Sequence, residues 1–129
     1  MGAQLLRANL SGVLFFNADL SGAALLHADL SGAAFMDTNL SDALLSKADL
    51  SNTHLFDTDL SRADLRDADL SAAWFHDTDL FGAELQGANL SRAKGLTQEQ
   101  LNMAKGDKMT KLPKGLQRPA AWLAARDPL

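Results

Sequence analysis

The chain has no cysteine, so it can form neither a disulfide nor a thiolate metal site. Its apolar runs are too short to span a bilayer, and no basic segment followed by an apolar stretch is visible. We therefore expect no membrane span, no signal peptide and a cytoplasmic location. With 47% hydrophobic and 22% charged residues among 129, the composition excludes a disordered chain and indicates one domain.

A five-residue period runs through the chain from Ala3 to Lys94. The word ADLSG at residues 18–22 returns at 28–32, with a looser five-letter word between them. Each pentad has a large apolar centre, and Ala, Thr or Val stands two positions before that centre. The eighteen centres are Leu5, Leu10, Phe15, Leu20, Leu25, Leu30, Phe35, Leu40, Leu45, Leu50, Leu55, Leu60, Leu65, Leu70, Phe75, Leu80, Leu85 and Leu90.

This period excludes both a continuous helix and a straight strand. At about 100° per residue, centres five apart would spread around a helix and leave no apolar stripe. Along a flat strand they would alternate between opposite faces. The pattern is satisfied if the chain turns a corner once per pentad, because the centre and the small residue then both face one enclosed axis. The two residues flanking the centre point outward, and the fifth residue lies at the corner.

A longer period of twenty residues indicates that four corners close one turn. Centres, flanking residues and corner residues of similar type all recur at this spacing. We number the four walls in chain order from their first centres, Leu5, Leu10, Phe15 and Leu20. The third wall is thus centred on Phe15, Phe35, Leu55 and Phe75.

The tandem words A(D/N)LSx resemble the pentapeptide-repeat family over residues 3–94. This resemblance implies an all-β solenoid, a right-handed quadrilateral β-helix. Four pentads per coil would give about 4.6 coils spaced about 4.8 Å apart, and hence a rod about 22 Å long. We expect residues 1–95 to form this β-helix.

Residues 96–129 are expected to form a C-terminal capping tail, because a terminal coil otherwise exposes its apolar cross-section. Thr97 and Gln100 have the spacing of a capping box, and Gly106 can end a helix. The sequence therefore predicts a short helix over residues 98–105.

The remaining tail predicts a second short helix from about Pro119. At the other end of the rod no cap is visible, since the repeat begins by Ala3. We expect this end to be open for stacking on another chain.

The outward positions of the third wall predict a protein-binding or self-association surface. Contiguous exposed apolar patches of several hundred square ångströms usually mark partner sites. Two alternatives are that the tail folds over this wall and that stacked aromatics only stabilise it. The predicted partner-binding residues are Leu14, Phe16, Met36, His54, Phe56, Trp74 and His76.

Three columns of carboxylates repeat every twenty residues. Stacked like charges about 4.8 Å apart should raise one another's pKa unless water or hydrogen bonds compensate. The columns are Asp29, Asp49 and Asp69; Asp19, Asp59 and Asp79; and, at a corner, Asp37, Asp57 and Asp77.

The charge distribution leaves an alternative function open. Residues 1–95 hold six bases and thirteen acids, a net of 6 − 13 = −7, and residues 96–129 hold six bases and three acids, a net of +3. The family resemblance raises an acidic DNA mimic that inhibits or protects a type II topoisomerase. Direct nucleic-acid binding is disfavoured, because phosphate contacts need basic stripes.

No catalytic or cofactor site is predicted. The three histidines occupy different pentad positions, and the chain has no zinc spacing and no phosphate-binding loop. A flat row of carboxylates is also a poor calcium site, because calcium takes six to eight oxygens. The sequence predicts a non-enzymatic repeat scaffold without metal or cofactor, acting on a protein partner or on its own copy.

Overall fold

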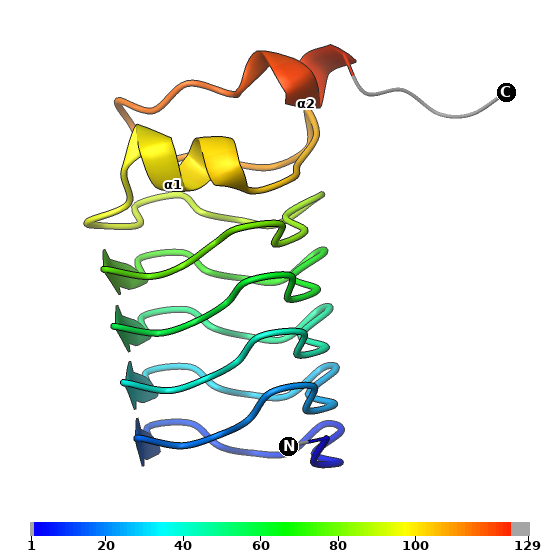
Figure 1. Ribbon diagram of the computed structural model, residues 1–129, viewed down its shortest axis with the longest axis vertical. Helices are drawn as coiled ribbons and strands as arrows, with labels where there is room; N and C mark the ends of the chain where they lie inside the picture. Colours follow the sequence, from blue (N-terminus) through cyan, green and yellow to red (C-terminus); the bar gives the residue numbers. More distant parts are fainter. Residues whose placement is uncertain (1, 125–129) are drawn as a thin grey trace, which may run out of the picture.

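The computed structural model describes residues 2–124, which form a stack of four-sided coils closed at one end by two helices (Figure 1). Short strands lie above one another along one side of the stack, and the chain's first described residues lie at the end opposite the helices. The elements are β1 (Leu14–Phe16), β2 (Ala34–Met36), β3 (His54–Phe56), β4 (Trp74–His76), α1 (Gln98–Met103) and α2 (Ala120–Ala124).

All four strands belong to the third wall and pair in parallel, in the order β1-β2-β3-β4. The register is twenty residues, so Phe15 pairs with Phe35 and Leu55 with Phe75. Single β-bridges at the same spacing join the coils on the other walls, as between Asp29 and Asp49. Four pentads per coil is therefore confirmed.

The corners are made by residues in the left-handed region. Every fifth residue from 7 to 92 has positive φ, whether it is glycine or not. Asn and Asp tolerate this conformation better than most residues, and Asn17 and Asp37 adopt it with φ of 53° and 49°. Arg62 and Ala72 adopt it as well, because backbone hydrogen bonds to the next coil hold these corners.

The pentad centres fill the inside of the coil. From Leu25 to Leu90 every centre is buried, and the small residues beside them are buried too. Directly after the corner between the third and fourth walls, the small residue is Thr38, Thr58 or Thr78. Its hydroxyl donates to the carbonyl of a third-wall centre one coil earlier, so this buried polar group is paired.

Helix α1 begins as predicted but ends earlier. Thr97 accepts a hydrogen bond from the Gln100 N–H, and Gln100 Oε1 accepts one from the Thr97 N–H, which completes a capping box. The helix was predicted to run over 98–105, whereas it ends at Met103 because the chain resumes pairing with the coil below, through a bridge between Lys105 and Glu84.

The tail continues the coil rather than leaving it. Gln100 donates to the Thr78 carbonyl and the Gly82 N–H donates to the Met103 carbonyl, so α1 takes the place of a fourth-wall segment. Further along, Lys111 bridges to Asn89 on the second wall.

The buried Trp122 of α2 closes the axis over this last partial coil. Its indole Nε1 donates to the Ala104 carbonyl at 3.1 Å. A Cβ at Gly106 would lie 2.5 Å from the indole ring, so Gly106 serves close packing rather than the helix stop that we predicted. The second helix is found where it was expected, one residue after Pro119, and residues 125–129 of the predicted tail lie outside the described residues.

Candidate functional site

The third wall presents its predicted residues outward, because alternate residues of each strand face the core and the solvent. Leu14 and Phe16 of β1 are 63% and 62% exposed. Met36, Trp74 and His76 are also exposed, whereas the side chains on β3, His54 and Phe56, are half-buried. The apolar surface is therefore largest at the first coil and continues along the wall.

Ring contacts order this surface between coils. His54 stacks on Trp74, with centroids 6.4 Å apart and ring planes 9° apart. Phe56 meets the edge of His76 at 5.7 Å. Lys94 Nζ lies 4.8 Å from the Trp74 ring centroid, a cation–π contact. These contacts hold the side chains in fixed positions, which lowers the conformational entropy lost when a partner binds.

Lys94 is a contributor that the sequence prediction missed. It stands twenty residues after Trp74, at the same outward position of the third wall, and bridges to it. The twenty-residue period could have assigned it to this surface. A search for apolar and aromatic side chains alone passes over it.

The described part of the tail does not cover the third wall. Both helices lie over the end of the stack rather than along its strands (Figure 1). With residues 96–124 in place, more than a third of the surface remains exposed on each of Leu14, Phe16, Met36 and Trp74.

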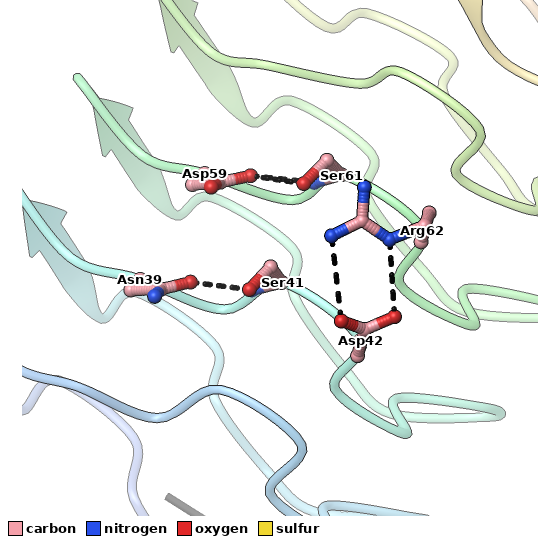
Figure 2. A network of polar contacts seen from close by, with 6 residues as sticks. All are labelled: Asn39, Ser41, Asp42, Asp59, Ser61 and Arg62. Carbon is pink, nitrogen blue, oxygen red and sulfur yellow. Dashed lines mark hydrogen bonds and ion pairs between the residues drawn. The ribbon is translucent and has the colours of Figure 1, made fainter.

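The second and fourth walls have a different outer surface, built from local hydrogen bonds. The Asp29 carboxylate accepts from the Ser31 hydroxyl at 2.7 Å and from the Ser31 N–H at 3.0 Å. Figure 2 shows the same arrangement at Asp59 and Ser61, and a similar one at Asn39. The other members with both bonds are Asn9, Asp19, Asp49, Asp69 and Asn89, and Asp79 accepts only from the Phe81 N–H.

At Asp19 and Asp29 these hydrogen bonds stabilise the ionised carboxylate. The Ser21 hydroxyl and N–H lower the pKa of Asp19 below 3.8, and the Ser31 hydroxyl and N–H do the same for Asp29. Hydrogen bonds to the ionised form favour it. At these two positions the hydrogen bonds compensate, as the prediction allowed, and the pKa falls instead of rising.

Basic and neutral residues also interrupt the acidic surface. Asn39 stands between Asp19 and Asp59 in the fourth-wall column. Arg62 forms an ion pair with Asp42 of the neighbouring coil, with 3.3 Å between Arg62 Nε and Asp42 Oδ1 (Figure 2). On the first wall Arg66 contacts Asp64, and its hydrogen bonds lower the pKa of that carboxyl.

The corner column of Asp37, Asp57 and Asp77 is exposed along its length. Among residues 2–124, no group of three or more His, Cys, Asp or Glu side chains is placed to hold a metal ion. Neither described helix has the length and apolar composition needed to traverse a bilayer.

Comparison with known proteins identifies the repeat. A family model described as pentapeptide repeats matches eight copies, over residues 2–32, 33–71 and 58–94. Comparison with curated protein sequences gives no match.

Several solved structures resemble the chain. Rfr23, a pentapeptide-repeat protein from the cyanobacterium Cyanothece 51142, is 26% identical with a TM-score of 0.46, over 84% of this chain and 90% of that chain. HetL from the cyanobacterium Nostoc sp. strain PCC 7120, involved in heterocyst differentiation regulation, is 30% identical with a TM-score of 0.40, over 87% of this chain and 49% of that chain. QnrB1, a plasmid-mediated fluoroquinolone resistance protein, is 21% identical with a TM-score of 0.37, over 83% and 74%.

The family match covers most of the chain and coincides with the coils whose centres, corners and bridges are described above. The chain therefore belongs to the pentapeptide-repeat proteins, and its fold is their right-handed quadrilateral β-helix.

Proposed function

We propose that this protein is a non-enzymatic scaffold that binds a protein partner through the outer face of the third wall. The observation that carries the proposal is the row of outward apolar and aromatic side chains on β1 to β4, exposed on β1, β2 and β4 and half-buried on β3, which the described tail leaves open. Among residues 2–124, no other wall carries such a row on every complete coil.

The chemistry of this row suits a protein surface. Aromatic residues and Met are enriched in protein interfaces, and Trp is frequent among the residues that dominate binding energy. Trp74 is 43% exposed and is held between His54 and Lys94, so it is a fixed anchor rather than a mobile one. Parallel strands also make a flat platform that needs no rearrangement to bind.

Site-specific photocrosslinking tests this proposal. A photoreactive phenylalanine analogue replaces Met36 on the third wall or, as the control, Ser51 on the second wall. Each variant is illuminated in extracts of the source cell. We expect a discrete crosslinked protein at Met36 and none at Ser51.

The substitution Trp74→Ser, made in the Met36 variant, should remove that product without unfolding the chain. The same crosslinked bands at both positions, or bands that survive Trp74→Ser, would contradict a specific third-wall site. Circular dichroism of each variant provides the folding control.

An acidic DNA mimic acting on a type II topoisomerase is the alternative. The runs Asp29, Asp49, Asp69 and Asp37, Asp57, Asp77 favour it, whereas Asn39 and the paired Arg62 and Arg66 reduce the continuity of the charge. The likeness to QnrB1 shows the fold alone. A gyrase supercoiling assay separates the two functions, since a mimic inhibits or protects the enzyme and a scaffold of the third-wall type leaves it unaffected at high molar excess.

A further inference from the structure

The corner that follows the third wall carries three exposed carboxylates, Asp37, Asp57 and Asp77, which we call the acidic corner. Among residues 2–124, the Asp37 and Asp57 carboxylates have no hydrogen-bond or ion-pair partner, and the Asp77 carboxylate has one, His76 Nε2 at 3.4 Å. The second-wall carboxylates, by contrast, accept hydrogen bonds from serines. Like charges on successive coils, about 4.8 Å apart, repel one another, so a cationic partner would stabilise the acidic corner.

The acidic corner borders the third wall on one side only. At the corner on the other side of the same three coils stand Gly32, Asn52 and Ala72, which carry no charge. Lys and Arg occur on this wall and its two corners only in the last coil, at Lys94 and Arg92. A partner lying on β2 to β4 therefore meets negative charge along one flank.

The backbone of the third wall is not available for pairing with a partner. Strands β2 and β3 pair in parallel with neighbours on both sides, so their ladder hydrogen bonds are already made. A partner must therefore bind through side chains. Each strand is three residues long, whereas the outward row continues from coil to coil, so this row extends along the rod.

The spacing of the row matches an α-helix better than an extended segment. Outward side chains recur once per coil, about every 4.8 Å along the rod. A helix lying along the rod presents one turn about every 5.4 Å, and its residues i and i+7 lie about 10.5 Å apart, close to the span of about 9.6 Å from β2 to β4. An extended chain presents the side chains of one face about every 6.8 Å. Successive helical turns can therefore meet successive coils.

We propose that the partner segment of the third wall is an amphipathic α-helix that lies along the rod, with Lys or Arg on the flank facing the acidic corner. This inference rests on the function proposed above and adds the chemistry of the partner. The apolar stripe of the helix packs on Met36, Phe56 and Trp74, of which Met36 is 37% and Trp74 43% exposed. Its basic flank pairs with the carboxylates of Asp37 and Asp57, which lie beside that stripe.

Selection from a displayed peptide library on the full chain tests this inference. Each peptide has about 18 residues, or about five helical turns, with apolar residues on one stripe and Lys, Glu or Ser allowed at every position beside it. We expect selection at low salt to enrich Lys on one flank of the stripe. Enrichment of Glu, no preference between flanks, or no selected binder would overturn the inference.

The helical conformation is tested on the same selected peptide. Proline at a central position breaks a helix but not an extended chain, so it should lower the affinity about tenfold or more. A serine at that position is the control. Binding that survives the proline would overturn the helical part of the inference.

A triple variant tests the acidic corner. Asp37→Asn with Asp57→Asn and Asp77→Asn should weaken binding of the selected peptide about tenfold or more at low salt, with a smaller effect as salt is added. These substitutions suit the backbone, because Asn17 already occupies the same corner position with φ of 53°.

A matched triple variant on the second wall is the control. Asp29→Asn with Asp49→Asn and Asp69→Asn removes the same charge from a wall where Asn89 already stands in the same column. It should leave the affinity within about twofold, because salt screens charges that do not face the peptide. Equal weakening by the two triple variants would overturn the inference.

The substitution Trp74→Ser separates this inference from the proposed function. Selected helices without a basic flank that lose binding in Trp74→Ser would leave the third wall as the partner site and overturn the inference alone. Basic helices whose binding survives Trp74→Ser would bind elsewhere and contradict both. Circular dichroism confirms folding of every variant.

Discussion

The second and third walls share the same interior and differ completely outside. Inside, each has a buried Leu or Phe beside a buried small residue, as Leu50 and Leu55 illustrate. Outside, Asp49 on the second wall bonds to Ser51 two residues away, whereas His54 on the third wall contacts Trp74 in the next coil. The inner residues therefore specify the coil, and the outer residues are free to differ between walls.

This difference also separates two kinds of surface. The Asp and Ser side chains satisfy each other within one pentad and leave a hydrated wall that needs no neighbour. The third-wall side chains contact each other across pentads and still leave apolar area exposed. Function is thus expected where the outer residues depart from the ordinary repeat.

The largest expected effect tests the shared interior. Leu50→Ala on the second wall and Leu55→Ala on the third should each lower the free energy of unfolding by about 2–5 kcal/mol, because each leaves a cavity in a packed core. Leu44→Ala, an outward Leu that is 43% exposed, is the control and should change it by about 0.5 kcal/mol or less. Urea titration measures all three, and a second-wall cost far from the third-wall cost would break the comparison.

A smaller effect is expected where the third and fourth walls meet. Thr78→Val should cost about 1 kcal/mol, because it removes the 2.7 Å hydrogen bond from the Thr78 hydroxyl to the Leu55 carbonyl. Thr78→Ser keeps the donor and should retain that hydrogen bond. Urea titration decides, and an equal loss in both variants would mean that the hydroxyl contributes nothing.

Much of this architecture could be predicted from the sequence, because the five- and twenty-residue periods directly encode the centres, the corners and the walls. The N-terminus of α1 was also predictable, since its capping box lies within four residues. Its C-terminus was not. The bridge from Lys105 to Glu84 joins residues twenty-one apart, so neither the repeat period nor local capping rules indicate it.

The candidate site was predicted less completely. The outward residues of the third wall follow from alternation, and the twenty-residue period places Lys94 beside Trp74. The cation–π contact itself depends on the side-chain conformation of Lys94. The concentration of apolar exposure in the first coil depends on which coils have neighbours on both sides. The lowered pKa of Asp29 depends on a serine rotamer that brings the hydroxyl to 2.7 Å.

The outer surface of the third wall should matter little for stability. Met36→Ser should change the free energy of unfolding by about 0.5 kcal/mol or less, because the side chain is 37% exposed and its removal opens no cavity. Urea titration of this variant beside Phe35→Ala, its buried neighbour, measures the contrast. A large loss in Met36→Ser would mean that the outer row is structural rather than available to a partner.

The smallest expected effect concerns the second wall and its local hydrogen bonds. Ser31→Ala removes the hydroxyl donor that contributes most to the lowered pKa of Asp29, so this pKa should rise toward 3.8. Ser46→Ala is the control, because Ser46 follows the centre of a pentad in which Leu44, not Asp, precedes that centre. NMR titration of the carboxyl carbons measures the pKa.

The same substitution affects stability. A pKa lowered by folding stabilises the protein above about pH 3.8, and this contribution is lost as the pH falls through the folded-state pKa. Ser31→Ala should therefore make the wild type and variant differ least in the most acidic solutions, and an unchanged Asp29 pKa would mean that the serine hydroxyl does not sustain the charge of this wall.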